Sequence, residues 1–437
     1  MPLFTALPFA ALLACIALLP LRAPHFWERN RHKTLVSGAL AAVFIGLLFT
    51  FGGATAARLL THALMDYASF VVLLGALFTL SGGIYLRGSL DGTPLGNVTL
   101  LALGAVLANL IGTTGASMVL IRPYLRANRD RVNKVHLVVF FIFIVSNTAG
   151  LLTPLGDPPL FLGFLKGVPF EWTLRLWPQW LLVVGALLAI FNVLDQRIFA
   201  REELERPGSQ LEEAMRHEPL RLEGRRNLWL MGAAILCVLG KGKGWFNGGE
   251  SWPFGVQEGL LFALAVASLR LTPKAVHEAN QFGYGPMIEV AVLFAGIFVT
   301  MIAPLEILNT HGAALGVRQP WQYFWASGLL SSFLDNAPTY LTFGAAAAGD
   351  VGLGFEGPRA LADYLATGAP AHVVLTAIAC GSVFMGANTY IGNGPNFMVK
   401  AIAEENGVQM PTFFGYMRWS AVVLLPIFAL VTAIFFV

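Results

Sequence analysis

A short polar segment interrupts an apolar run twice in this sequence, and it constrains the fold more than any other feature. The first copy, Thr153 to Phe161 (TPLGDPPLF), breaks the run from about 135 to 165, and the second, Thr389 to Phe397 (TYIGNGPNF), breaks the run from about 372 to 404. At a shift of 236 residues, nine of the 26 positions from 136 to 161 are identical. The identical pairs are His136/His372, Val138/Val374, Ile142/Ile378, Ser146/Ser382, Gly150/Gly386, Thr153/Thr389, Gly156/Gly392, Pro159/Pro395 and Phe161/Phe397. This pattern predicts an internal duplication with a broken membrane helix at the centre of each half.

The composition excludes an ordinary soluble protein. The chain is 56% hydrophobic and only 12% charged, whereas soluble domains carry roughly 25% charged residues. We therefore expect an all-α polytopic membrane protein. Apolar stretches long enough to cross about 30 Å of hydrocarbon occur near 3–21, 35–52, 67–86, 135–165, 173–194, 228–240, 256–271, 286–305, 372–404 and 416–437, of which 228–240 and 256–271 are short.

Two further apolar segments, about 95–127 and 321–347, are interrupted midway by polar and turn-forming residues. The interruptions are NLIGTTGAS at 109–117 and LDNAPT at 334–339. Each segment is long enough for two half-length helices, so each predicts a re-entrant hairpin. Lys and Arg are enriched on the cytoplasmic side of membrane proteins, and with the N-terminus outside this topology puts most of them there, including the cluster from Arg122 to Lys134.

A polar stretch at 195–227 divides the chain into two halves and predicts a cytoplasmic linker. The N-terminal repeat is then 1–194 and the C-terminal repeat is 228–437, each with five crossings and one hairpin. An odd number of crossings forces the second repeat into the opposite orientation, so we expect two inverted repeats. We predict a multi-pass protein of the bacterial inner membrane with both termini periplasmic.

A helix that breaks at membrane depth leaves backbone groups that are costly unless they are paired, so the two breaks mark cavities. Carbonyl groups at the end of one half-helix suit a cation, and amides at the start of the next suit an anion. The hydroxyls of Thr153 and Thr389 and the side-chain amides of Asn388 and Asn393 add neutral oxygens of the kind that coordinate sodium. The alternative is that these side chains only cap helix ends.

Three carboxylates stand out, because an acid inside the membrane is costly and usually functional. Asp157 lies in the first break, Asp335 in the second hairpin, and Glu289 near the start of a crossing. Two carboxylates that converge in one pocket repel, so one of them can hold a proton and exchange it for sodium. Alternatively, Asp157 and Asp335 cap the helices that follow them, and Glu289 is solvated.

Other features argue against competing functions. We interpret His136 and His372 as structural, and the three cysteines lie far apart in apolar runs. There is no phosphate-binding loop of the GxxxxGK[ST] type, so transport would depend on ion gradients and not on ATP. We find neither a nucleophile paired with a base nor a metal-binding cluster in the sequence, so we do not expect an enzyme. No cofactor is expected beyond sodium and protons, and no nucleic acid partner.

These motifs resemble the ion transporter superfamily, which includes NhaD-type sodium/proton antiporters, arsenite permeases, citrate transporters and dicarboxylate symporters. Ser146-Asn147-Thr148 is similar to a Ser-Asn-Thr signature of the superfamily, and the segments TPLGDPP and DNAP, which contain Asp157 and Asp335, look most like the NhaD-type branch. The resemblance implies that these two aspartates bind cations and protons. It also implies a homodimer in which the hairpin-containing part moves.

Our leading hypothesis is sodium/proton antiport by alternating access, with sodium held at Asp157 and Asp335. The candidate ion-binding or substrate-binding residues are Asp157, Asp335, Asn336, Thr153, Thr389, Asn388, Asn393, Asn147, Thr113, Thr114, Gly156 and Gly392. The alternative is a sodium- or proton-coupled symporter of citrate or another carboxylate. The neutral second break and the neutral GTTG of the first hairpin favour this alternative, and the lack of Lys or Arg at the interruptions argues against it. An ion channel is a weaker third reading. The partners expected are a small ion or carboxylate and membrane lipid.

Overall fold

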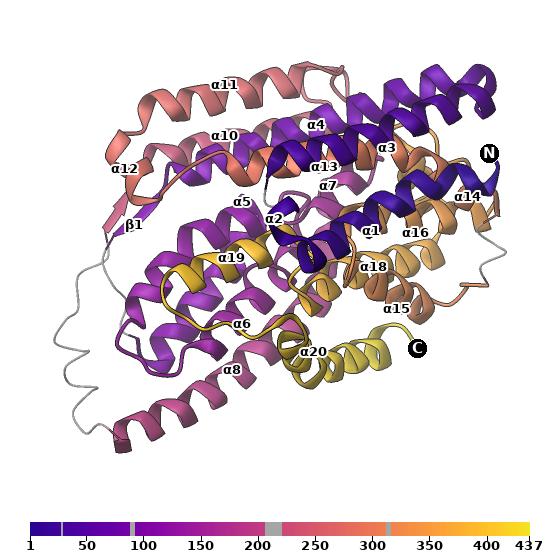
Figure 1. Ribbon diagram of the computed structural model, residues 1–437. Coiled ribbons are helices and arrows are strands. Elements are labelled where there is room, and N and C mark those ends of the chain that lie inside the picture. Colours follow the sequence, from indigo (N-terminus) through magenta and orange to yellow (C-terminus); the bar gives the residue numbers. More distant parts are fainter. Residues whose placement is uncertain (28, 88–91, 206–220, 312–315) are drawn as a thin grey trace.

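The computed structural model describes residues 1–437 except 28, 88–91, 206–220 and 312–315, and most of its helices run in the same general direction (Figure 1). In the first half the helices are α1 Leu7–Arg22, α2 Pro24–Trp27, α3 Asn30–Phe51, α4 Ala56–Gly82, α5 Pro94–Ala127, α6 Val135–Ile144, α7 Pro158–Leu165 and α8 Trp177–Glu205. In the second half they are α10 Arg226–Lys243, α11 Val256–Leu271, α12 Lys274–Ala279, α13 Gly285–Thr300, α14 Ile302–His311, α15 Pro320–Ser331, α16 Asn336–Asp350, α17 Ala360–Leu365, α18 Ala369–Met385, α19 Gly394–Glu405 and α20 Phe413–Phe435. Short 3-10 helices include η3 Thr148–Leu152 and η6 Gly386–Asn388.

By length and composition alone, eight segments of the described chain could cross a membrane, although one of them, Pro94–Ala127, is interrupted at Gly112. They are Leu3–Pro20, Asn30–Phe51, Gly53–Gly82, Pro94–Ala127, Val135–Leu152, Phe170–Leu204, Ala369–Asn388 and Phe413–Phe435, and the pair α13 and α14, bent by 41°, is a ninth candidate. The protein is therefore a polytopic, mostly helical membrane protein. The crossings predicted at 228–240 and 256–271 do not belong to this set, because α10 carries three basic residues and α11 has only 16 residues.

The structure differs from an all-helical chain at one end, where a two-stranded sheet forms. Strand β1, Tyr85–Arg87, pairs antiparallel with β2, Arg221–Glu223. Three-residue strands are too short to leave a periodic pattern in the sequence. The sheet also ties down the end of the predicted linker at 195–227, whose first residues continue helix α8 as far as Glu205. The rest of that linker includes 206–220, which lie outside the described residues.

The segment α5 is a hairpin and not a straight helix. At Gly112 the backbone takes φ 78° and ψ 155°, which is a conformation that essentially only glycine adopts. The two arms fold back on each other, so Asn97 and Asn128 exchange hydrogen bonds of 2.9 and 2.7 Å at the open end.

Helices α15 and α16 form a second hairpin around the turn at 332–335. The rings of Tyr323 and Phe343, one on each arm, meet edge to face at 6.5 Å. In Figure 1 the first hairpin lies toward the left of the molecule, and α15 and α16 lie toward the right. The two hairpins thus approach the centre from opposite ends.

Both predicted helix breaks are present, and they share one backbone path. The chain leaves η3 at Thr153 with φ −139° and ψ 153°, and leaves η6 at Thr389 with φ −139° and ψ 167°. Just before the next half-helix, Asp157 has φ −147° and ψ 145°, and Asn393 has φ −154° and ψ 141°. Corresponding residues of the two sequence copies therefore adopt the same local structure.

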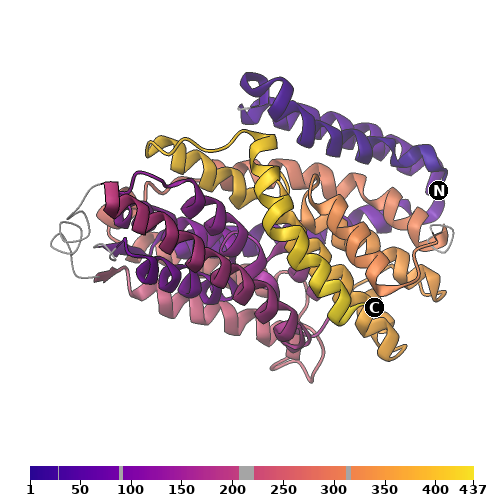
Figure 2. The ribbon, with the colours of Figure 1, turned by 90° about the horizontal axis from the view of Figure 1, so that it is seen from below.

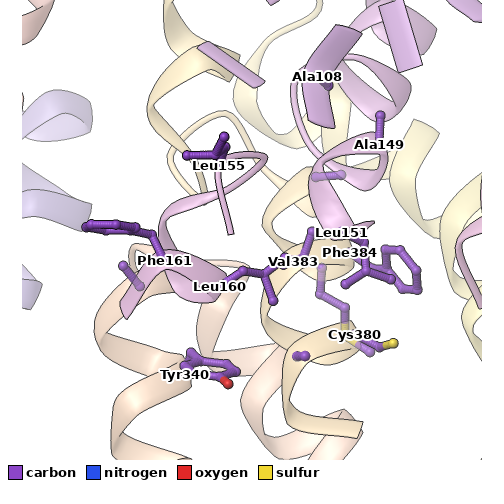
Figure 3. Packing of buried hydrophobic residues seen from close by; sticks show 14 of the residues in the cluster. Ala108, Ala149, Leu151, Leu155, Leu160, Phe161, Tyr340, Cys380, Val383 and Phe384 are labelled. Atoms are coloured by element: carbon purple, nitrogen blue, oxygen red, sulfur yellow. The ribbon is translucent and has the colours of Figure 1, made fainter. Parts of the chain in front are cut away.

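Apolar packing holds the breaks in place. Helix α6 is apolar on nearly every side and is buried from His136 to Ile144, as expected for a helix at the centre of a bundle. In Figure 3, Leu151 and Leu160, from the two sides of the first break, lie near Val383 and Phe384 of α18. By contrast, α3 lies along the outside of the bundle (indigo in Figure 2), with only 17% of its span buried.

A cluster of buried charges joins the first hairpin to α6 and α8. The Arg131 guanidinium donates to Asp195 Oδ1 at 2.8 Å and to Glu202 Oε2 at 2.6 Å, and the Arg131 side chain is only 3% exposed. The Asp195 carboxylate also bonds His136 Nε2 at 2.9 Å and accepts from Asn97 Nδ2 at 2.9 Å. This buried ion cluster therefore fixes both the open end of the hairpin and the first turn of α6.

Candidate functional site

Asp157 is the centre of the most polar part of the interior. It occupies the N-cap position of α7, but its side chain makes no capping hydrogen bond and is only 1% exposed. Instead, Oδ1 accepts hydrogen bonds from Thr113 Oγ1 at 3.1 Å and from Asn393 Nδ2 at 3.3 Å, and Oδ2 accepts one from Asn336 Nδ2. Among the described residues, no Lys, Arg or His forms an ion pair with it. A buried carboxylate with only neutral donors needs a proton or a bound cation to offset its charge.

The donors to Asp157 come from all the other polar interruptions. Thr113 follows the break in the first hairpin, Asn336 is the first residue of α16 in the second hairpin, and Asn393 precedes α19 in the second break. The backbone N–H of Thr113 also donates to Gly156 O at 2.9 Å. Hairpin tips and breaks that are far apart in the sequence thus meet at one carboxylate.

Asp335 caps the helix that follows it in the second hairpin. Its Oδ1 accepts a hydrogen bond from Ala337 N at 3.2 Å, so it caps α16, and it is half-buried. The neighbouring Asn336 is the residue that contacts Asp157. The structure therefore shows Asp335 in the capping role that the sequence left open as an alternative, and its expected part in binding a cation stays a prediction.

The two predicted threonines tie each break to its own hairpin. Thr153 Oγ1 donates to Asn109 O, and Thr389 Oγ1 donates to Ser332 O. Thr389 Oγ1 also accepts from the backbone N–H of Gly392 at 3.1 Å. These hydroxyls thus satisfy backbone groups that the broken helices leave free.

Asparagine side chains form hydrogen bonds from each break to the other. Asn147, before the first break, donates to Asn396 Oδ1 at 2.5 Å, and Asn396 in turn donates to the carbonyls of Gly386 and Thr389 at 2.9 Å each. In return, Asn393 donates to Ser146 O at 3.2 Å. Sequence reasoning missed Asn396, although it replaces the apolar Leu160 of the first copy, and this replacement was a usable signal.

Three amide oxygens around the breaks have no hydrogen-bond partner among the described residues. They are Oδ1 of Asn147, Asn336 and Asn388, and all three atoms are buried. A buried acceptor without a partner costs about 1–3 kcal/mol. Neutral oxygens near a carboxylate are suitable ligands for a sodium ion, and Asn336, whose Nδ2 donates to Asp157, carries one of these oxygens beside that carboxylate.

The remaining predicted residues lie outside this cluster. Thr114 is half-buried, and the threonine that bonds Asp157 is its neighbour Thr113. Glu289 forms an ion pair with Lys33 at 2.7 Å, and its side chain is 41% exposed. His372 accepts a hydrogen bond from Trp172 Nε1 at 2.8 Å, and thus has a structural contact, as His136 does in the buried ion cluster.

The glycines of the breaks allow the chain to fold tightly. A Cβ atom at Gly156 would lie 2.2 Å from Gly150 O, and one at Gly392 would lie 2.5 Å from Gly386 O. Because backbone atoms cannot yield cheaply, we expect Gly156→Ala to destabilise the protein by about 1–3 kcal/mol and to impair transport. The measurement is the melting temperature in detergent. Gly185→Ala in α8, where a Cβ meets nothing within 4 Å, is the control, and equal melting temperatures for the two variants would contradict the prediction.

Comparison with known proteins gives one family. The family model CitMHS_2, described as "Putative citrate transport", matches residues 1–436. The comparison with curated proteins finds no match.

Proposed function

Because the chain belongs to this citrate transport family, we propose that it is a secondary transporter for citrate or a related carboxylate, driven by cations that bind at Asp157. The match over nearly the whole chain confirms the resemblance to the citrate-transporter-like part of the ion transporter superfamily. Membership in a transporter family also indicates that the protein moves a solute across a membrane and is not an enzyme.

The observation that carries the proposal is the environment of Asp157. Its carboxylate is buried and receives hydrogen bonds from Thr113, Asn336 and Asn393, all of them neutral donors. Sodium or a proton can offset the charge of the Asp157 carboxylate. Transport would be coupled to an ion gradient if one cation replaced the other there, or if the bound cation were released on one side of the membrane. Each elementary charge that crosses 100 mV supplies about 2.3 kcal/mol.

Sodium/proton antiport is the second candidate. It is favoured by the absence of a described Lys or Arg paired with Asp157, since such a residue would help to hold an anionic substrate there. It is also favoured by the similarity of TPLGDPP to the NhaD-type branch. In this reaction sodium and protons would themselves be the transported substrates, and Asp157 would bind them in turn.

We further propose that the two halves are inverted repeats that work by alternating access in the bacterial inner membrane. The opposite directions of the two hairpins and the shared backbone path of the two breaks support this arrangement. Both termini lie at the same end of the molecule (Figures 1 and 2), in keeping with the proposed periplasmic position of both. The apolar outer face of α3 would suit contact with lipid or with a second copy in a homodimer.

A transport assay separates the two candidates. Purified protein in proteoliposomes is given labelled citrate, with and without an inward sodium or proton gradient, and internal pH is recorded in parallel. We expect saturable citrate uptake that collapses when both gradients are removed. Sodium-driven proton movement in the absence of any carboxylate, without citrate uptake, would instead establish the antiporter. If correctly folded protein shows neither activity, both citrate transport and sodium/proton antiport are contradicted.

A further inference from the structure

An open groove lies between α10 and α11, at the end where the loop 244–255 joins the two helices, and it has a volume of about 740 Å³. Pockets that bind small ligands have volumes of about 300–1,000 Å³. Its lining combines Leu236 and Leu260 of the helices with Trp245, Phe246 and Trp252 of the loop, and no residue in the lining is charged. We call it the aromatic groove, and it is separate from the polar cluster at the breaks.

The polar side-chain donors in the groove are already used within the loop. Asn247 Nδ2 donates to Glu250 O at 3.0 Å and to Ser251 O at 3.2 Å, and Trp252 Nε1 donates to Trp245 O at 2.5 Å. A charged or strongly polar solute would lose its hydration here without gaining partners. The groove therefore suits a hydrocarbon ligand.

The groove opens on an apolar face of the protein. Neither α10 from 227 to 240 nor α11 from 259 to 269 contains a charged residue, and large apolar side chains point outward there, such as Trp229 at 84% and Phe262 at 65% exposure. Figure 1 shows α11 at the edge of the molecule. In a polytopic membrane protein, a face of this kind contacts lipid.

The exposed aromatic residues of the loop lengthen this apolar face. The two uncharged stretches span only about 17–21 Å at 1.5 Å per residue, which is less than the roughly 30 Å of hydrocarbon in a bilayer. Trp245, Phe246 and Phe254 are exposed beyond their ends. Aromatic side chains are enriched at the boundary between membrane and water, so the groove lies where lipid chains begin.

The loop is held firmly against α10, so the groove is already formed. A Cβ atom at Gly240 would lie 2.8 Å from the ring of Trp252 and 3.2 Å from the ring of Trp245, which shows that both indoles pack on the bare backbone of the helix. The backbone N–H of Trp245 also donates to Gly240 O at 3.0 Å. A ligand would therefore bind without ordering the loop.

Phe246 stands at the rim of the groove in a strained backbone conformation. Its φ of 60° lies in the left-handed region, which bulky side chains rarely adopt, and its side chain is fully exposed. Strain of this kind persists mainly at ligand-binding and other functional sites. An asparagine would fit the same turn with less strain, so the turn itself does not require a phenylalanine. An apolar molecule from outside the chain would account for the ring.

We propose that the aromatic groove binds one acyl chain of a membrane phospholipid, with Phe246 and the two indoles packed along that chain. The uncharged lining, the continuity of the groove with the lipid-facing side of α10 and α11, and the strained aromatic residue at the rim all fit this ligand. The proposal does not depend on which solute the protein transports.

Photochemical labelling tests the proposal in lipid vesicles. The purified full-length protein is reconstituted into phosphatidylcholine vesicles that contain a phosphatidylcholine with a diazirine in one acyl chain, and after irradiation the labelled residues are found by mass spectrometry. We expect the groove to be labelled more strongly than the outer face of α3. Because about two buried CH₂ groups correspond to a tenfold change in affinity, Ala263→Trp, which fills the groove, should lower labelling there by about 10-fold or more. Ala42→Trp, at an exposed position of α3, is the matched control and should leave it unchanged.

Phe246→Asn separates a binding role from a structural one. If the ring serves the ligand, this variant loses groove labelling while its melting temperature in detergent stays at least as high as that of the wild type, because asparagine relieves the strain. A lower melting temperature with full labelling would overturn the role of Phe246. Equal labelling of the groove and of α3, or groove labelling that Ala263→Trp leaves unchanged, overturns the lipid site. Chemical cross-links between two copies through 244–255, with no lipid label there, would overturn it in favour of a second copy as the occupant.

Discussion

Replacement of Asp157 by Asn is expected to lower the rate of transport by about 100-fold or more, because the charge that holds the coupling cation is lost. In addition, the amide groups of Asn336 and Asn393 then face a side chain that can accept hydrogen bonds at only one atom. The side chain keeps its size, so the break should still fold. The measurement is the initial rate of gradient-driven uptake or exchange in proteoliposomes, normalised to the amount of reconstituted protein.

The same chemical change at an exposed site controls for folding and reconstitution. Asp363, which is paired with Arg359 at the surface, provides it as Asp363→Asn, and this variant should transport at the wild-type rate. Asp335→Asn should be milder than Asp157→Asn, because an asparagine caps a helix about as well as an aspartate does. Undiminished, still sodium-dependent transport by Asp157→Asn would show that the coupling cation binds elsewhere.

The second large effect is expected on stability, from Arg131→Gln. Burial alone would lower the pKa of Arg131, but the carboxylates of Asp195 and Glu202 outweigh burial and raise it, so the guanidinium stays charged. Without it, two carboxylates lie close together in the interior with no cation between them. We expect a loss of about 3–5 kcal/mol, as for other buried ion pairs that lose one partner.

The melting temperature and the yield of monodisperse protein measure this loss. Arg129→Gln is the matched control, because Arg129 lies two residues away in the same loop and its side chain is 73% exposed. It should melt like the wild type, since exposed ion pairs contribute about 0–1 kcal/mol. If Arg131→Gln melted no lower than Arg129→Gln, the buried ion cluster would not be the tie between α5, α6 and α8 that its contacts indicate.

The breaks and the hairpin tips could be predicted because Pro and Gly act locally. The prolines around Asp157 and the unusual backbone at Gly112 are properties of a few consecutive residues, and they can be read directly from the sequence. The identity of the contacts could not be read in this way. Which side chain of the second hairpin donates to Asp157 depends on the rotation of α16 about its axis, and in the structure the donor is Asn336.

The buried ion cluster could not be predicted from the sequence either. Arg131 belongs to a run of basic residues that indicates a cytoplasmic loop, and Asp195 begins a stretch rich in Glu and Arg that indicates a solvated linker. Each pattern is typical of an exposed surface when it is considered alone. The residues are buried only because they meet, and they lie 64 positions apart.

The hydrogen bonds that Asp157 receives from distant parts of the chain have a consequence for biosynthesis. Asp157 and Thr113 enter the membrane early, whereas Asn336 and Asn393 are synthesised 179 and 236 residues after Asp157. Until they arrive, the first half holds a carboxylate with one donor in place of three. The nascent N-terminal half is therefore incomplete in its most costly region, and it depends on the last third of the polypeptide to become a stable unit in the bilayer.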